Sequence, residues 1–372
     1  MFEQPQPSPV MTRVQRLASV VWLSLAACSH QPPADFVPDP SLVSHIRSIE
    51  MHVPQYACPG QSFDADYVAI LDDGARIPFA ERYDRKHPPR LHVVFLERNS
   101  YTATALQAGG WTPEHDPLVT LRSGFRLNAY LRDKPVIADS ATVAPSYECL
   151  RHAFAFEGPT GPHGQTGGDG PDVTVRIGIL RTPFYDRLIV AGIEVGEAPP
   201  FYVVGDGRTV PPRDWLIINS QGGRGGQGEK GTRGRAGQKG NSGCPGSNGA
   251  DGEDGQSGAR GGDGGRGGHI TIIVPSENPF LSGLVDARVD GGAAGPGGAG
   301  GEAGQGGDAG DGGSDRNGNA CTKGNKGRSG RAGVAGQDGR PGVPGPRPQV
   351  ITVPGRSVFG PRAPQELLDL VR

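Results

Sequence analysis

The sequence has few aromatic residues, almost no net charge and no long apolar run. Aromatic residues make up 6% of the 372 positions, and 37 basic residues nearly balance 39 acidic ones. That balance excludes a basic nucleic-acid-binding protein and a polyanionic disordered tail. No segment approaches the ~18 consecutive apolar residues of a membrane-spanning helix, which excludes a polytopic membrane protein.

The sequence also lacks recognisable catalytic and metal-binding motifs. It contains no Gly-x-Ser-x-Gly elbow, no phosphate-binding loop and no His-Glu-x-x-His pair, and its nine histidines are scattered. The segment 261–266 places Arg266 where a calcium-binding glycine repeat needs an aspartate, and the acidic clusters read as solvated loops. We therefore expect no catalytic residue, no cofactor and no metal, and a chain that is not an enzyme.

The beginning of the chain predicts export. Residues 11–28 read MTRVQRLASVVWLSLAAC, with two arginines, a short apolar stretch and small residues at the end. The Leu-Ala-Ala-Cys ending resembles the lipobox of bacterial lipoproteins, in which cleavage precedes a lipidated cysteine. The resemblance implies a signal peptide over 1–27 with its start at Met11, lipidation of Cys28, and attachment to the outer membrane, facing the periplasm or the cell surface. Residues 28–43 would then hold the lipidated cysteine and a proline-containing tether. The alternative is an ordinary signal peptide with a coincidental cysteine.

Glycine is the abundant residue, and it is placed periodically. Of 62 glycines, 44 lie between Gly222 and Gly345, and 32 of these occupy every third position in four blocks of equal length. We name these blocks arm 1 (222–243), arm 2 (246–267), arm 3 (292–313) and arm 4 (324–345). A shorter triplet run covers 158–170. Strand-like segments lie between arms 2 and 3, at 269–274 and 284–290, and after arm 4, at 349–353.

Glycine at every third position indicates polyproline II helices that pack closely through a bare side. The repeat resembles that of collagen-like bacterial proteins. A polyglycine II bundle, in which several such helices of one chain lie side by side, fits the composition better. Only 3 of the 88 arm residues are proline, whereas collagen needs at least ~15–20%. The arms carry net charges of +4, −2, −3 and +3, so consecutive arms paired as hairpins attract. We predict a monomeric bundle; a homotrimeric collagen-like rod and a disordered glycine-rich region are the alternatives.

Four cysteines remain after Cys28, an even number in an exported protein, where thiols pair. Four cysteines allow three connectivities. Cys244 and Cys321 fall at the proposed turns of the two hairpins, which favours a bridge between them. A second bridge, Cys58–Cys149, would then join the two ends of the preceding region.

The remaining patterns predict an all-β protein with almost no helix. Short strand-like runs between 44 and 157 indicate a β-sandwich-like head, and residues 46–74 are loosely similar to bacterial Ig-like repeats. We expect strands with a short glycine-triplet loop over 158–220, the Gly-X-Y region with intervening strands over 221–348, and a terminal strand and short helix over 349–372. The head strands are expected at Ile46–Val53, Tyr67–Leu71, Leu91–Leu96, Phe125–Leu131 and His152–Phe156.

Together these features predict a lipid-anchored envelope or surface protein with a structural or adhesive role. Its expected partners are the membrane, through the lipid anchor, and a matrix component, a glycan or a neighbouring cell surface, but not nucleic acid. Two other functions stay open: a homotrimeric collagen-like surface filament, and an enzyme or accessory lipoprotein that acts on envelope polymers.

Overall fold

The computed structural model describes residues 32–33 and 36–371, and it is an all-β protein. The α-helices of this part of the chain are single turns, α2 (Pro40–Ser44) and α3 (Gln365–Leu368). The chain divides into two compact units. The first contains its described residues up to Leu150 together with Thr182–Phe184, and the second contains Arg151–Arg181 and the chain from Tyr185 onward.

The first unit contains two small sheets and a hairpin that share one apolar core. One sheet has the order β1-β3-β4 and the other β2-β9-β8-β5, and β6 pairs with β7. The strands are β1 (Ile46–His52), β2 (Tyr56–Ala57), β3 (Asp66–Leu71), β4 (Arg76–Pro78), β5 (Leu96–Asn99), β6 (Ala103–Ala105), β7 (Trp111–Pro113), β8 (Phe125–Leu131) and β9 (Lys134–Pro145).

Alternation of side chains explains why these segments form half-buried strands. In β8, Phe125, Leu127, Ala129 and Leu131 are buried, and the intervening residues point outward. Two large aromatic residues of the core have partners for their polar atoms: Trp111 Nε1 donates to the hydroxyl of Tyr67 at 2.9 Å, and that hydroxyl donates to the carbonyl of Gly109 at 3.0 Å. The hydrogen-bonding groups of Trp111 and Tyr67 are therefore satisfied inside the core.

Two sequence expectations for this region are changed by the structure. Leu91–Leu96 was expected to be a strand, but Val93–Phe95 forms the 3-10 turn η1, and β5 begins only at Leu96. The turn forms because Nδ1 of His92 accepts the N–H of Val94 at 3.2 Å, which caps it. The long strand β9 was not predicted, since its residues alternate weakly in polarity. The Cys58–Cys149 disulfide is present, with Cα atoms 6.2 Å apart.

The second unit is built on two sheets that share a second apolar core. Three parallel strands form one sheet in the order β10-β14-β16, and five strands form the other in the order β13-β12-β11-β15-β17. The strands are β10 (Ala153–Glu157), β11 (Val173–Leu180), β12 (Leu188–Val195), β13 (Phe201–Asp206), β14 (Leu216–Gln221), β15 (Ile270–Pro275), β16 (Val285–Arg288) and β17 (Gln349–Val353).

The expected domain boundaries are wrong on two points. Strand β10, assigned from the sequence to the head, pairs in parallel with β14, so the second unit begins at Arg151 and not after residue 157. The expected segments 158–220 and 221–348 form one unit. Strands β14 and β15, which flank the first two arms, lie in different sheets across the shared core.

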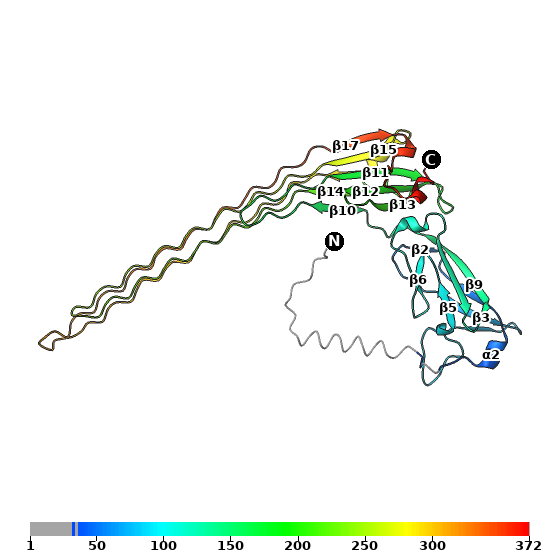
Figure 1. Ribbon diagram of the computed structural model, residues 1–372, viewed down its shortest axis with the longest axis horizontal. Helices are drawn as coiled ribbons and strands as arrows, with labels where there is room; N and C mark the ends of the chain where they lie inside the picture. Colours follow the sequence, from blue (N-terminus) through cyan, green and yellow to red (C-terminus); the bar gives the residue numbers. More distant parts are fainter. Residues whose placement is uncertain (1–31, 34–35, 372) are drawn as a thin grey trace. The chain divides into compact units, whose positions relative to one another are not determined.

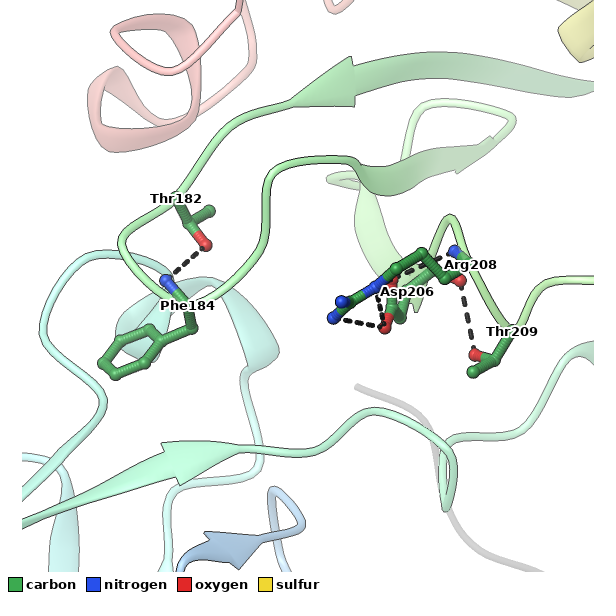
Figure 2. Close-up of polar contacts among 5 residues, drawn as sticks. All are labelled: Thr182, Phe184, Asp206, Arg208 and Thr209. Atoms are coloured by element: carbon green, nitrogen blue, oxygen red, sulfur yellow. Dashed lines mark hydrogen bonds and ion pairs between the residues drawn. The ribbon is translucent and has the colours of Figure 1, made fainter.

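Short polar turns close some of the strand connections (Figure 2). In the first unit, the N–H of Phe184 donates to Oγ1 of Thr182 at 3.3 Å. In the second unit, Oδ1 of Asp206, at the end of β13, accepts the backbone N–H of Arg208 at 3.0 Å. At the end of the chain, α3 covers the second unit with Leu367, which is fully buried, in line with the expected terminal helix.

Candidate functional site: a bundle of glycine-triplet helices

Each glycine-triplet segment is a direct continuation of a strand of the second unit. The segments that leave the sheets follow β10, β14 and β16, which are neighbours in one sheet. The segments that return lead into β11, β15 and β17, which are neighbours in the other sheet. The four long arms run side by side beyond the sheets (Figure 1). The bundle therefore inherits its two layers from the β-sandwich, which explains why β14 and β15 lie in different sheets.

Backbone hydrogen bonds repeat every three residues along the bundle. Within each layer the arms are parallel: Gly231 of arm 1 donates to Ala299 of arm 3, and Gly255 of arm 2 donates to Arg331 of arm 4, at 2.9 and 2.8 Å. Between the layers the arms are antiparallel. Ala250 of arm 2 donates to Gln238 of arm 1 at 2.9 Å, and arm 3 bonds arm 2 and arm 4 bonds arm 3 in the same manner.

The four arms therefore form a rhombus in cross-section. Arms 2 and 3 bond to each other and to both remaining arms, and arms 1 and 4 occupy opposite corners. Within the described residues, arms 1 and 4 exchange no backbone hydrogen bond. Because neighbouring arms are antiparallel between layers and every arm belongs to one chain, this packing differs from the parallel three-chain winding of collagen.

The glycines outside the triplet register mark additional packing faces. There are eight of them, and a Cβ atom at each would lie under 3.0 Å from a neighbouring backbone atom. Gly223, Gly226, Gly262 and Gly265, on arms 1 and 2, face the short hairpin at 158–171. On arm 3, Gly297, Gly300 and Gly306 face arm 4, and Gly312 faces Cys321 in the second turn. From Glu229 on arm 1 outward, residues with side chains stand at the positions that correspond to Gly223 and Gly226. The short hairpin therefore cannot pack against arm 1 beyond that point.

A ladder of Asx side chains joins arm 2 to arm 4. Oδ1 atoms of arm 2 accept the backbone N–H groups that follow the glycines of arm 4: Asn248 from Asn325, Asp251 from Arg328, Asp254 from Arg331 and Asp263 from Arg340. These bonds are 2.6–2.8 Å long and provide partners for N–H groups that the glycine packing leaves free. Sequence reasoning missed this ladder. The sequence does contain a pattern that marks the ladder, since these Asx residues all stand two positions after a register glycine.

The ion pairs of the bundle run mainly from the corner arms to arm 3. Arg233 of arm 1 lies 3.5 Å from Glu302, and Lys326 of arm 4 lies 3.2 Å from Asp308. Lys323 hydrogen-bonds Asp311 and holds the pKa of that carboxyl below its ordinary value. The expectation that each positive arm pairs with its hairpin partner holds for arm 4. The ion pairs of arm 1 reach arm 3 instead of arm 2, because arm 3 is its parallel neighbour.

The tip of the bundle is closed by a disulfide. Arm 1 reverses at Cys244 and Pro245, and Ser247 then bonds back to Asn241 at 2.9 Å, as predicted for the first hairpin. Cys244 is bonded to Cys321, with Cα atoms 5.1 Å apart, which confirms the predicted pairing. In the second turn, Oδ1 of Asp315 accepts the N–H groups of Asn317 and Asn319 at 2.8 Å and orders the loop.

The other sequence-derived site is Cys28, which lies outside the described residues. In the first unit, a pocket of ≈ 560 Å³ is bordered by Phe36, His92 and Phe95, and Asp133 is the carboxylate on its wall. Over residues 32–33 and 36–371, no group of three or more His, Cys, Asp or Glu side chains is arranged to hold a metal ion. The same residues include no helix with the length and apolar character needed to cross a membrane.

Comparisons of the chain with protein-family models, with curated proteins and with solved structures gave no match.

Proposed function

We propose that the chain is a lipid-anchored protein of the bacterial envelope, with a structural or adhesive role and no catalytic one. The observation that carries the proposal is the bundle itself. At ~3.1 Å per residue, arms of 22 residues extend ~70 Å from a β-sandwich base, and a disulfide joins their turns. A hydrogen-bonded rod with exposed charged side chains suits spacing and contact, and it offers no enclosed surface for a small substrate.

The packing of the glycines supports a monomer over a collagen-like homotrimer. The register glycines of each arm donate their N–H groups within the same chain, so they are not free to line the axis of a three-chain helix. The pocket of the first unit supports a non-enzymatic role over an enzyme acting on envelope polymers. Its wall carries one carboxylate, Asp133, where glycoside hydrolysis uses a pair.

The anchor is tested by fractionation of cells that express the full chain. The wild-type protein should sediment with outer membranes and partition into detergent, because a lipidated Cys28 would hold it there. Cys28→Ser should move to the soluble fraction, whereas Ser24→Ala, a change inside the same apolar stretch, should leave the protein in the membrane. Membrane association of Cys28→Ser equal to wild type would refute lipid anchoring through this residue.

A further inference from the structure

The cationic side chains of the bundle are concentrated on its two corner arms. Arm 1 carries five Lys and Arg residues and one Glu, and arm 4 carries four Lys and Arg residues and one Asp. The inner arms, 2 and 3, have net charges of −2 and −3. Because the corner arms lie on opposite sides of the rhombus and do not bond to each other, the positive charge forms two separate edges.

Most carboxylates of the inner arms already have hydrogen-bond or ion-pair partners within the bundle. Three carboxylates of arm 2 accept backbone N–H groups of arm 4, and those of arm 3 form ion pairs with the corner arms. Six exposed cations of the edges have no carboxylate within 4 Å of their charged groups in the described chain: Arg224, Lys230, Arg235; Arg328, Arg331, Arg340. Of these, Arg340 still interacts electrostatically with Asp263. Arg224 and Lys230 lie beside the part of arm 3 that contains Ala293, Pro296 and Ala299. This part of arm 3 has no carboxylate with which they could form an ion pair.

The spacing of these cations indicates the kind of polymer they fit. Arg328 and Arg331 are one triplet apart, ~9.3 Å along a polyproline II helix, and Arg224 and Lys230 are two triplets apart, ~19 Å. Both spacings exceed the ~8 Å Debye length at physiological salt. Each cation therefore pairs with a separate anionic group of a bound polymer. Double-stranded DNA carries a charge every ~1.7 Å, a far denser array, and neither arm has an aromatic side chain for base stacking. Gln227, Thr232 and Gln238 lie between the cations of arm 1 and offer hydrogen bonds to hydroxyl groups.

We propose that each cationic edge binds a linear anionic glycan, a polysaccharide with carboxylate, sulfate or phosphate groups at intervals of one or two sugars. With two opposite edges on one rod, a single molecule bridges two glycan chains. Each contact is weak alone, and several along one rod give the affinity. This inference rests on the proposed adhesive role and assigns its partner.

Binding and bridging are measured separately with the full-length protein in detergent. Biosensor titrations use alginate, dextran sulfate and neutral dextran, at ~0.05 M and ~0.5 M salt to vary screening. The wild type should bind both anionic polymers at low salt, lose them at high salt, and raise the light scattering of alginate by bridging its chains. Arg224→Gln/Lys230→Gln/Arg235→Gln should still bind through arm 4 but no longer raise the scattering.

Removal of both edges tests the assignment of the surface. Adding Arg328→Gln/Arg331→Gln/Arg340→Gln should weaken alginate binding by at least ~tenfold, as expected for several lost cations near a polyanion. The matched control, Arg82→Gln/Arg85→Gln/Lys86→Gln, removes three exposed cations of the first unit and should change neither signal. Thermal melting of each variant verifies that the bundle is folded.

Four results would overturn the assignment: equal loss in the control, alginate binding retained after removal of both edges, equal binding of neutral dextran, or tighter binding of DNA or of vesicles containing phosphatidylglycerol. None of these results bears on the membrane fractionation of Cys28→Ser, so failure of the glycan assignment and failure of the lipid anchor are distinguishable.

Discussion

Oδ1 of Asp254 accepts the backbone N–H of Arg331 at 2.6 Å, and the two residues are 77 positions apart. The same separation of 77 applies to the other rungs of the Asx ladder and to the disulfide between Cys244 and Cys321. The disulfide is therefore the outermost link of the register between arms 2 and 4. The disulfide and the hydrogen bonds of the Asx ladder thus share one offset between arms 2 and 4 along the bundle.

The ladder predicts that Asp254→Ala destabilises the bundle. The N–H of Arg331 loses its carboxylate acceptor, and we expect the free energy of unfolding to fall by ~0.5–1.5 kcal/mol in chemical denaturation. The control is Ser257→Ala on the same row of arm 2, where no such bond is made to arm 4. Equal stability of the two variants would mean that the ladder does not contribute.

The close packing of the arms predicts a large effect of a single methyl group. Gly301 lies on inner arm 3, and a Cβ there would come under 3.0 Å from the carbonyl oxygen of Thr232. Gly301→Ala should lower the free energy of unfolding by ~1–3 kcal/mol or more, since backbone cannot move aside as a side chain can. In Gly283→Ala the added Cβ meets nothing within 4 Å, so its melting temperature should stay close to wild type.

The sequence predicted the bundle well because its period has one physical meaning. Glycine at every third position requires a three-residue helix with a bare side, and the low proline content and alternating arm charges favoured a single-chain bundle over collagen. The eight glycines outside the register pack against the short hairpin, arm 4 and Cys321 of the second turn.

Other features could not be predicted from the residue pattern, because a local side-chain bond or a contact between distant segments decides them. The apolar run at Leu91–Leu96 reads as a strand, yet a local bond from Val94 to His92 turns part of it into η1. The assignment of β10 to the second unit depends on its pairing with β14, about 60 residues away in the chain. That arm 1 forms its ion pairs with arm 3 depends on the layer order, which no single arm encodes.

The disulfide at the tip is expected to stabilise the bundle, and reduction of the disulfide should remove this stabilisation. Cys244→Ser/Cys321→Ser opens a loop of 77 residues, and the chain-entropy model gives a loss of up to ~4–5 kcal/mol. Hydrogen exchange should rise first at the arm ends near Asn241 and Ser247, because their mutual bonds are next to the lost link. Unchanged exchange at the tip together with unchanged stability would contradict the structural role of this bridge.

Acidic pH is expected to weaken the bundle. The backbone N–H of Arg340 lowers the pKa of Asp263 from 3.8, and Lys323 lowers that of Asp311 from the same value. A depressed pKa in the folded state contributes stability that is present above the unfolded pKa and is lost as the pH falls through the folded one. The melting temperature should therefore decline below about pH 4. Asp263→Asn/Asp311→Asn should show a smaller decline over the same interval, and an identical decline would exclude these two groups as its source.

The central claim is that the arms fold back on one another within a single chain, and one distance tests it directly. The N–H of Ala259 donates to the carbonyl of Glu229 at 2.8 Å across arms 1 and 2. Spin labels at positions 229 and 259 should therefore lie within about 20 Å of each other, and the distance should persist on dilution with unlabelled protein. In one continuous collagen-like rod the same 30-residue separation spans ~90 Å. A distance near that value would contradict the single-chain bundle.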